Sequence, residues 1–254
     1  MNRNSIFVTG ISGGLGFAIG RSLLTSGNDV IGISRGTKSE ILGKLGKIAK
    51  EQGTIFISEI GDFEDLVKIK EKLVNKEFVK ITSTISHLII SHGMNFNKSI
   101  LDLNTDQIEK SMRVNFSGPF LLAQHFLKIW RTEFLKGKMK TDHSIVYISS
   151  VATKGGSPDE VAYHSAKRAM ESAMLSFARE GAKYGIRANV ISPGLMDTEM
   201  GKKTLKDRPD VLKRIPLGRL TGVEEISKAI LFLINSPSTT GQNLHINGGR
   251  YTSI

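Results

Sequence analysis

The amino-acid sequence predicts an α/β protein with a doubly wound parallel sheet and helices on both faces. Short apolar runs alternate with segments of helical periodicity along the whole chain, a pattern typical of repeated strand–helix–strand units. The runs are continuously apolar rather than alternating, as expected for strands that are covered on both faces. A glycine-rich turn follows the first run, which is where a Rossmann-type fold holds a dinucleotide.

We expect strands at residues 5–10, 29–34, 54–58, 87–91, 144–149, 187–192 and 243–246. The expected helices cover residues 16–27, 38–51, 62–74, 104–130, 160–184 and 223–235. Gly27 should end the first helix and Asp62 should cap the third. Because crossovers between parallel strands are right-handed, the ligand should lie at the carboxyl ends of the strands.

A single domain is expected over residues 1–254, because the chain has no Pro/Ser-rich linker, low-complexity tract or internal repeat. Hydrophobic residues make up 39% of the chain, enough for a sizeable core. The absence of cysteine excludes disulfides, thiolate catalysis and thiolate zinc sites, and we expect no metal. The N-terminus lacks an apolar signal-peptide region and no stretch approaches 18 apolar residues, so we expect a soluble cytoplasmic protein without a membrane partner.

The net charge of +11, from 35 Lys+Arg against 24 Asp+Glu, raises the question of a nucleic-acid or other anionic partner. The basic residues are dispersed, and most are spaced like solvated helix faces. Examples are Lys44, Lys47, Lys50, Lys68, Lys70, Lys72, Lys136, Lys138 and Lys140. No zinc-finger or aromatic RNA-binding motif accompanies them, so we expect no nucleic-acid partner.

The stretch TGISGGLG, Thr9 to Gly16, leaves the first strand and opens the first helix. Gly10 suits a tight turn, while Gly14 and Gly16 allow close approach of a ligand and of the neighbouring strand. The N–H groups at the start of the helix attract a pyrophosphate. Gly10, Gly14 and Gly16 fit G-x-x-x-G-x-G, but Gly10, Gly13 and Gly16 fit G-x-x-G-x-x-G, so the spacing leaves two motif variants open.

A second motif, VAYHSAKRAM, lies in the helix expected at 160–184. It places Tyr163 and Lys167 four residues apart, so that a phenol and an ammonium lie one turn apart on the same face. Alone, this stretch would indicate an ordinary surface pair. Together, TGISGGLG and YHSAK resemble the short-chain dehydrogenase/reductase family. Its classical branch has the first glycine spacing and suits a length of 254 residues.

The resemblance extends over nearly the whole chain. MRVNFSGPF is similar to the family's central N-x-x-G segment and places Asn115 at the catalytic asparagine. SIVYISSVA is similar to the segment of the catalytic serine, and the family's thirteen-residue spacing to the tyrosine selects Ser150 over Ser149. ISPGLMDTEM is similar to the P-G-x-x-x-T cofactor loop. The closing segments resemble those of 3-oxoacyl-carrier-protein reductases and of sugar and polyol dehydrogenases.

The resemblance implies that Asn115, Ser150, Tyr163 and Lys167 are catalytic. The cofactor contacts that it implies are Gly10, Ser12, Gly14, Leu15, Gly16, Arg35, Glu59, Ile60, Ser91, Gly93, Tyr163, Lys167, Pro193, Gly194, Met196 and Thr198. Among these, Glu59 and Ile60 resemble the pair that brackets adenine in relatives.

One segment departs from the family pattern. Where the family has N-N-A-G after the fourth strand, this chain has Ile90, Ser91, His92 and Gly93. The change removes two amides that brace the sheet and the cofactor ribose in relatives. We expect Ser91 to replace part of that bonding. His92 either stacks or hydrogen-bonds near the cofactor, or is an incidental loop residue.

The spacing of Tyr163 and Lys167 has a chemical use. Reducing a ketone requires a proton at oxygen as hydride reaches carbon, and a free tyrosine has a pKa near 10. A nearby cation favours the phenolate, so we expect Lys167 to lower the pKa of Tyr163. The resemblance adds that Lys167 holds the nicotinamide ribose, that Ser150 orients the substrate oxygen and that Asn115 holds a water linking Lys167 to solvent.

The end of the second strand favours NADP(H) over NAD(H). NAD-specific folds carry an acid there, bonded to the ribose 2′-hydroxyl, whereas this chain has Ser34 followed by Arg35. Arg35 can bind a 2′-phosphate and stack on adenine. Against this preference, Gly13 stands where many NADP-dependent relatives carry a second basic residue, so NAD(H) is kept as the alternative.

The substrate is expected to be a small-molecule or carrier-bound ketone, reduced to a secondary alcohol, with a 3-oxoacyl thioester as one candidate. A substrate lid is expected around residues 196–214. Its basic residues are Lys202, Lys203, Lys206, Arg208, Lys213 and Arg214. They favour an anionic or carrier-bound substrate, or are simply a solvated surface. The alternatives are an NAD(H)-dependent sugar or polyol dehydrogenase and, in another class, a non-catalytic NADP(H)-sensing scaffold. The resemblance also implies a homotetramer, in which the tail GGRYTSI would pack against another subunit.

Overall fold

The computed structural model describes residues 3–36, 39–138, 142–207 and 209–251. Lys140, Arg208 and residues 252–254 of the tail, which figured in the sequence analysis, lie outside these ranges. The side chain of Met200 is likewise not described.

A seven-stranded parallel sheet forms the centre of the protein, with the strand order β3-β2-β1-β4-β5-β6-β7. The strands are β1 (Ser5–Thr9), β2 (Asp29–Ser34), β3 (Phe56–Ile60), β4 (His87–Ile90), β5 (His143–Ile148), β6 (Ile186–Pro193) and β7 (Asn243–Ile246). The chain runs outward from β1 in one direction and returns to continue from β4 in the other. This reversal confirms the doubly wound fold, and it creates the crevice at the carboxyl ends where such sheets bind ligands.

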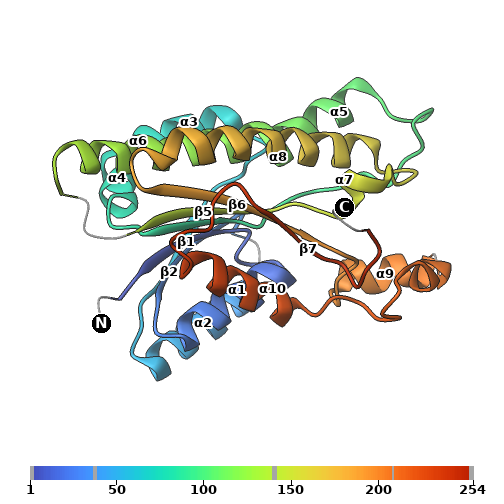
Figure 1. The fold of residues 1–254 in the computed structure, drawn as a ribbon, viewed down its shortest axis with the longest axis horizontal. Coiled ribbons are helices and arrows are strands. Elements are labelled where there is room, and N and C mark those ends of the chain that lie inside the picture. Colours follow the sequence, from blue (N-terminus) through green and yellow to red (C-terminus); the bar gives the residue numbers. More distant parts are fainter. Residues whose placement is uncertain (1–2, 37–38, 139–141, 208, 252–254) are drawn as a thin grey trace.

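Helices cover both faces of the sheet (Figure 1). On one face lie α1 (Gly14–Thr25), α2 (Ser39–Gln52) and α10 (Val223–Ile234). On the other lie α3 (Leu66–Val74), α4 (Lys76–Thr82), α5 (Thr105–Met112), α6 (Gly118–Leu135) and α8 (Val161–Ala182). The other short elements include α7 (Ala152–Gly155), α9 (Glu199–Asp207) and the 3₁₀ helix η2 (Pro209–Arg214). No described helix is long and apolar enough to cross a membrane.

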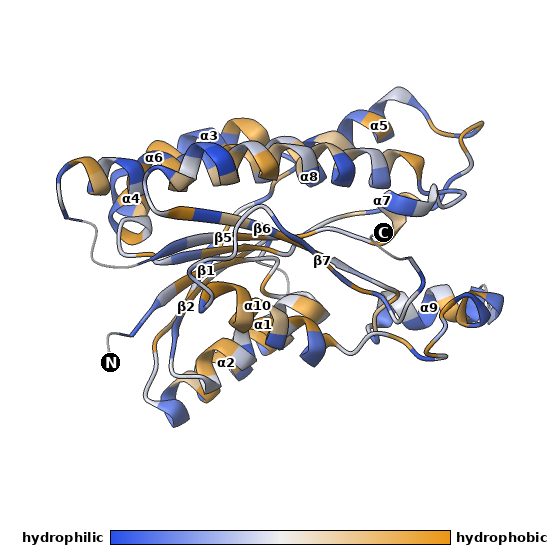
Figure 2. Cartoon of the chain, in the orientation of Figure 1, coloured by the Kyte–Doolittle hydropathy of each residue, from blue (hydrophilic) through white to orange (hydrophobic). Residues whose placement is uncertain are grey.

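Two apolar cores lie between the sheet and its helix layers, and Figure 2 shows the hydrophobic residues concentrated there. Phe7 belongs to the core under α6 and α8, while its neighbours Ile6 and Val8 belong to the core over α1 and α10. Because both faces of β1 are buried, no position of the strand faces water. This explains why the strand reads as a continuous apolar run.

The structure corrects two expected helices and adds one that was not expected. The helix expected at 104–130 is interrupted by a π-helical turn, η1 (Arg113–Ser117), between α5 and α6. The third helix is capped by Asp65, which accepts from Lys68 N at 3.1 Å, and not by Asp62. The helix α4 was not expected. It begins because Asn75 caps it, accepting backbone N–H bonds in the manner that starts helices.

Candidate active site

The predicted catalytic residues come from three elements that meet at the carboxyl end of the sheet. Ser150 follows β5, Tyr163 and Lys167 lie in the first two turns of α8, and Asn115 lies in η1. The Ser150 side chain lies near enough to Tyr163 to lower the pKa of its phenol. The Ser150 hydroxyl also accepts from Ala152 N at 3.1 Å, which fixes it at the start of α7. The structure therefore brings the serine and the tyrosine together as predicted.

Lys167 is buried beside Tyr163, with 2% of its surface exposed. Its Nζ donates to Ile148 O at 2.8 Å and to His92 O at 3.3 Å. The same atom lies 5.8 Å from the centre of the Tyr163 ring and 4.7 Å from that of Tyr147. Two carbonyl oxygens and two aromatic faces thus surround an ammonium that has almost no access to water.

The expected lowering of the Tyr163 pKa is not found in this structure. Enclosure raises the pKa of Tyr163 to about 12, although the hydrogen bond from Ser150 opposes the rise. Burial likewise lowers the pKa of Lys167 to about 7, against the attraction of Glu171. Withdrawal from water disfavours the charged form of both groups, and at Tyr163 it outweighs the opposing effect of Ser150.

Asn115 braces the loop after β4. Its Oδ1 accepts from Met94 N at 3.0 Å, and its Nδ2 donates to Met94 O at 2.9 Å and to Ser111 Oγ at 3.1 Å. A Cβ built at Gly93 would lie 2.9 Å from Asn115 Oδ1 and 3.2 Å from Lys167 Nζ. Only a glycine therefore lets this loop pass between the amide and the ammonium. The side-chain amide is fully engaged in these bonds, so a water link to Lys167 through Asn115 stays a prediction.

Ser91 and His92 replace the bracing that the missing asparagines would supply. Ser91 N donates to Thr9 Oγ1 at 3.0 Å, and Ser91 Oγ donates to Thr9 O. His92 Nε2 donates to Val114 O at 3.1 Å, which leaves Nδ1 to accept from the Thr9 hydroxyl at 2.7 Å. The ring stacks on Phe63 with centres 4.0 Å apart. Burial lowers the pKa of His92 to about 3, so this brace is neutral.

The glycine turn after β1 is tightly packed. Gly10 has φ of 69° and donates its N–H to Ile33 O at 2.8 Å. A Cβ built at Gly16 would lie 2.0 Å from Gly10 O, so α1 begins against the turn itself. Gly13 precedes α1 without a side-chain cap. The first N–H groups of α1 are therefore left for an anion. Gly10 and Gly16, common to both motif spacings, are the positions that the geometry requires.

The loop after β6 closes over this turn. Pro193 O accepts from Val151 N at 2.9 Å, which ties the loop to the serine segment. A Cβ built at Gly194 would lie 2.9 Å from Asn247 Cα. The Thr198 side chain lies 3.8 Å from the position of a Cβ on Gly14. The P-G-x-x-x-T segment and the glycine turn therefore form two sides of one cradle.

The sequence is similar to those of known reductases over nearly its whole length. The model of a family described as enoyl-(acyl carrier protein) reductase matches residues 10–251. A 3-oxoacyl-acyl-carrier-protein reductase, FabG, of Rickettsia conorii is 29% identical over 95% of this chain and 94% of its own. An L-xylulose reductase of Caenorhabditis elegans is 31% identical, over 96% of this chain and 94% of its own.

The chain belongs to the short-chain dehydrogenase/reductase family. A solved structure from Agrobacterium tumefaciens is also similar. Its protein is described as a 2-deoxy-d-gluconate 3-dehydrogenase and holds bound NADP. That structure has 25% identity, covers 97% of this chain and 96% of its own, and superposes with a TM-score of 0.83.

In this short-chain dehydrogenase/reductase, the residues predicted for the adenine end lie at the ends of β2 and β3. Arg35 is exposed, and no hydrogen bond or ion pair joins it to another described residue. The Glu59 carboxylate is paired with Lys72 Nζ at 2.6 Å. Ile60 is 71% exposed and lies against Gly36. Of the two residues expected to bracket adenine, Ile60 is thus the one whose side chain is exposed and available for contact.

The expected lid contains α9 and η2. Two of its basic residues pair with acids of the same segment, Lys202 with Asp197 at 3.0 Å and Arg214 with Asp210 at 2.9 Å. Lys203, Lys206 and Lys213 are exposed. The segment is joined to the body where Met196 forms a bridge with Thr221. Its positive charge at the surface is therefore smaller than the sequence suggested.

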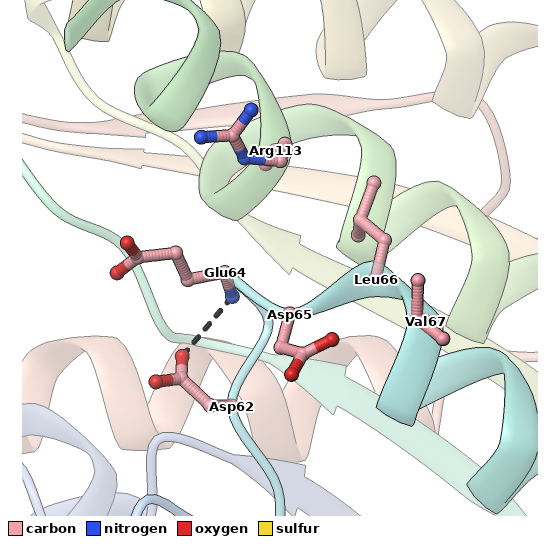
Figure 3. Close-up of a pocket in the computed structure, with 6 residues that line it drawn as sticks. All are labelled: Asp62, Glu64, Asp65, Leu66, Val67 and Arg113. Atoms are coloured by element: carbon pink, nitrogen blue, oxygen red, sulfur yellow. Dashed lines mark hydrogen bonds between the residues drawn. The ribbon is translucent and has the colours of Figure 1, made fainter. Parts of the chain in front are cut away.

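A hollow of about 580 Å³ opens at the start of α3 (Figure 3). It is lined by Asp62, Glu64, Asp65, Leu66, Val67 and Arg113. Within it, Asp62 accepts from Glu64 N at 3.0 Å. None of the four predicted catalytic residues lines this hollow, so it is distinct from the catalytic site.

Three residues that support the site were not found from the sequence. Thr9 bonds both Ser91 and His92, Tyr147 lies under the Lys167 ammonium, and Glu171 is buried near the serine segment. Thr9 and Tyr147 lie inside apolar strand runs, where they look like ordinary strand residues. Only Glu171 carried a signal, because it follows Lys167 by four residues and so lies on the same helix face.

Proposed function

We propose that the protein is an NADP(H)-dependent oxidoreductase that interconverts a ketone and a secondary alcohol. The observation that carries this proposal is the meeting of the Ser150 hydroxyl, the Tyr163 phenol and the buried Lys167 ammonium. A proton donor, a second hydrogen-bond donor and a cation are the groups that carbonyl reduction requires.

In the reducing direction, the Tyr163 hydroxyl gives its proton to the carbonyl oxygen and Ser150 donates a hydrogen bond to the same oxygen. NADPH, when bound, supplies the hydride. The pKa of about 12 keeps Tyr163 protonated at neutral pH, which is the form that reduction uses. The ammonium of Lys167 stabilises the phenolate that remains.

The residues present fit a dinucleotide with a 2′-phosphate. The glycine turn and the loop after β6 form two sides of one cradle, and Gly16 and Gly194 allow the close backbone packing on which it depends. Arg35 extends from the end of β2 with no acid beside it in the sequence, and a guanidinium suits a phosphate. NADP(H) is therefore the cofactor, as in the relative from Agrobacterium tumefaciens.

A 3-oxoacyl thioester on an acidic carrier is the first candidate substrate. Lys203, Lys206 and Lys213 on the lid are exposed, and the reductase of Rickettsia conorii is named for such a substrate. A sugar or polyol is the second candidate, because the relatives from Caenorhabditis elegans and Agrobacterium tumefaciens are described as acting on such compounds.

The test is oxidation of NADPH and NADH by the purified protein with a panel of ketones. The panel contains a 3-oxoacyl carrier protein, the same acyl group on a short thiol, and keto sugars. We expect NADPH to be consumed fastest with the carrier-bound thioester. The double variant Lys203→Ala/Lys206→Ala should raise KM for the carrier form and leave the short thioester unchanged. Binding of NADPH without turnover of any ketone would instead indicate a sensing scaffold.

A further inference from the structure

Glu171 is the one acidic residue that is buried among the described residues, with 5% of its surface exposed. A buried carboxylate is costly unless hydrogen bonds and an opposite charge compensate it. Arg168, on the same helix, donates to Glu171 Oε2 at 2.8 Å. Because Arg168 is 59% exposed, its charge is largely screened by water, and this pair alone does not explain the burial.

The other carboxylate oxygen is bonded to the segment that carries the catalytic serine. Glu171 Oε1 accepts from the Ser149 hydroxyl at 2.5 Å and from the Thr153 hydroxyl at 2.8 Å. Ser192 Oγ, on β6, lies 3.4 Å from the same atom. Ser149 and Thr153 stand on either side of Ser150, and the Thr153 hydroxyl also lies 2.9 Å from Ser150 O. One oxygen atom therefore holds the serine segment to α8.

The same carboxylate acts on Lys167. The two residues are four apart in α8 and both are buried, so their side chains lie on one face of the helix. Burial lowers the pKa of Lys167, and the negative charge of Glu171 opposes that lowering. Removing this charge would shift Lys167 further towards the neutral amine.

We propose that Glu171 is a positioning residue of the active site, which anchors the Ser150 segment to α8 and keeps Lys167 in its ammonium form. Its kinetic consequences rest on the proposed function, whereas its effect on Lys167 does not. The other ionisable groups around Glu171 are Arg168 on α8, Tyr147 on β5 and His245 on β7. Lys154 on α7 acts on His245 as well.

The first experiment is an NMR titration of the lysine ¹³Cε signals in the protein without substrate or cofactor, with the Lys167 signal assigned from Lys167→Arg. Glu171→Gln keeps the shape and the acceptor oxygen but loses the charge. We expect it to move the Lys167 midpoint to lower pH by about one unit. Glu180→Gln, an exposed change on the same helix, should leave the midpoint in place. An unchanged midpoint in a folded Glu171→Gln protein overturns the proposal.

Arg168→Gln provides a second variant with the opposite sign. This substitution removes the exposed positive charge that is paired with Glu171. The negative charge of Glu171 then acts more strongly on Lys167, so the Lys167 midpoint should rise. If Glu171→Gln does not fold, Ser149→Ala/Thr153→Val carries the test, because it removes the hydroxyl donors and keeps the charge, and an unchanged kcat in that variant overturns the anchoring role. His245→Gln separates the smaller contribution of the β7 histidine. These titrations remain informative even if the protein reduces no ketone.

The second experiment is the pH profile of kcat/KM for ketone reduction. In Glu171→Gln the alkaline limb should move down by about one pH unit, which corresponds to about tenfold lower kcat/KM at a fixed pH on that limb. Ser149→Ala/Thr153→Val removes the hydroxyl donors but leaves the charge. It should lower kcat without moving that limb to lower pH. A wild-type limb in Glu171→Gln would contradict the assigned role.

Discussion

At Tyr163, burial raises the pKa of the phenol and the Ser150 side chain lowers it, and burial has the larger effect. The phenol stays protonated because its pKa lies at about 12, although the nearby Ser150 side chain acts to lower it. A nearby ammonium then contributes mainly when negative charge develops on the phenol oxygen, which is the differential stabilisation that catalysis requires. The value of Lys167 thus lies in the transition state more than in the resting enzyme.

Tyr163→Phe tests this account at a single oxygen atom. Phenylalanine fills nearly the same volume but has no proton to give, so kcat for ketone reduction should fall by about 10²–10⁴-fold. The melting temperature and the Kd for NADPH should change little. Retention of more than a tenth of the wild-type kcat would remove Tyr163 from the proton-transfer step.

Arg35→Ala tests the cofactor preference. A charge-assisted hydrogen bond contributes about 1.5–3 kcal/mol, so binding of NADPH should weaken about 10- to 150-fold. NADH lacks the phosphate and should weaken only a few-fold, through lost stacking on adenine. Titration of both cofactors against wild type and variant gives the answer.

Adding an acid in Ser34→Asp/Arg35→Ala should turn the preference towards NADH. In the wild type, added salt should reduce the preference for NADPH, because the contact is exposed and screened. Equal losses for the two cofactors in Arg35→Ala would show that Arg35 does not read the phosphate.

Among the elements, the π-helical turn η1 connects several parts of the site through its hydrogen bonds. It carries Asn115, and its carbonyl oxygens accept from one side chain of the loop after β4 and from one side chain of β5. Val114 O accepts from His92 at 3.1 Å, and Asn115 O accepts from the Tyr147 hydroxyl at 3.1 Å. Such turns interrupt regular helix bonding and are frequent at functional sites. Here the loop after β4 and strand β5 both donate hydrogen bonds to carbonyl oxygens of the turn.

Tyr147→Phe removes one of these bonds and keeps the aromatic ring under Lys167. The buried Asn115 carbonyl would lose this donor, which typically costs about 1–3 kcal/mol. We expect the free energy of unfolding, measured in urea, to fall by that amount. Tyr184→Phe is the matched control, because its hydroxyl makes no hydrogen bond with another described residue and should change stability little. Equal stability of the two variants would argue against a role for the Tyr147 hydroxyl.

Most of the sheet could be predicted from the sequence, because strands buried on both faces give continuous apolar runs such as SIFVT in β1. The turn η1 could not, since MRVNFSGPF continues the helical periodicity on both sides of it. Ser150, Tyr163 and Lys167 were predicted to meet and do so. The shift in the Tyr163 pKa was predicted with the wrong sign, because enclosure depends on segments far apart in the chain.

For the whole molecule, we predict a homotetramer. Leu175 on α8 and Phe232 on α10 are each more than half exposed, and such apolar surface favours association. Within the chain, Tyr251 of the tail packs against Gly155, and its carbonyl accepts from Asn247 Nδ2 at 2.9 Å. Light scattering at micromolar concentration should give four times the 27.8 kDa of one chain. A monomer mass would contradict this prediction.

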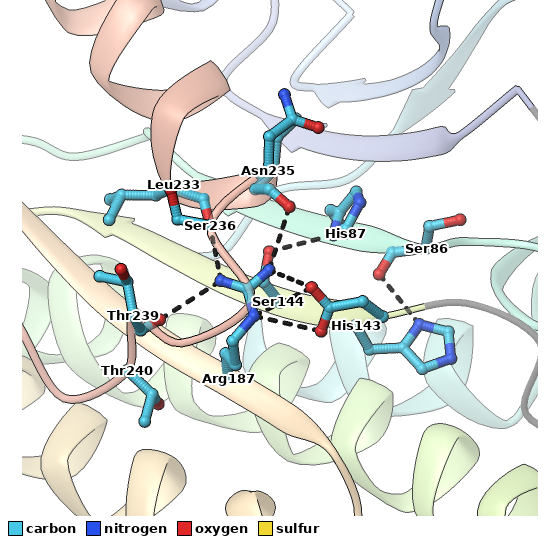
Figure 4. A network of polar contacts seen from close by, with 12 residues as sticks. Ser86, His87, His143, Ser144, Arg187, Leu233, Asn235, Ser236, Thr239 and Thr240 are labelled. Atoms are coloured by element: carbon cyan, nitrogen blue, oxygen red, sulfur yellow. Dashed lines mark hydrogen bonds and ion pairs between the residues drawn. The ribbon is translucent and has the colours of Figure 1, made fainter. Parts of the chain in front are cut away.

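Far from the catalytic residues, a buried polar network spans the amino ends of β4, β5 and β6 (Figure 4). His87 Nδ1 lies 3.0 Å from Ser144 Oγ, and His143 Nδ1 donates to Ser86 O at 3.0 Å. Arg187 bonds Asp142 and the carbonyl oxygens that end α10. Burial, then His143 and Arg187, lower the pKa of His87 to about 3.

This network predicts loss of stability in mild acid. A histidine whose folded pKa lies below its unfolded value of about 6.5 supports folding above pH 6.5, and that support is lost as pH falls towards 3. With 2% of His87 exposed, the loss from this residue should reach about 2 kcal/mol at pH 5. His143, whose pKa burial also lowers, adds to the effect. His87→Gln cannot titrate, so its free energy of unfolding, measured in urea from pH 7 to pH 5, should fall about 2 kcal/mol less than that of the wild type. Parallel curves for the two proteins would show that His87 is not the group whose protonation destabilises the fold.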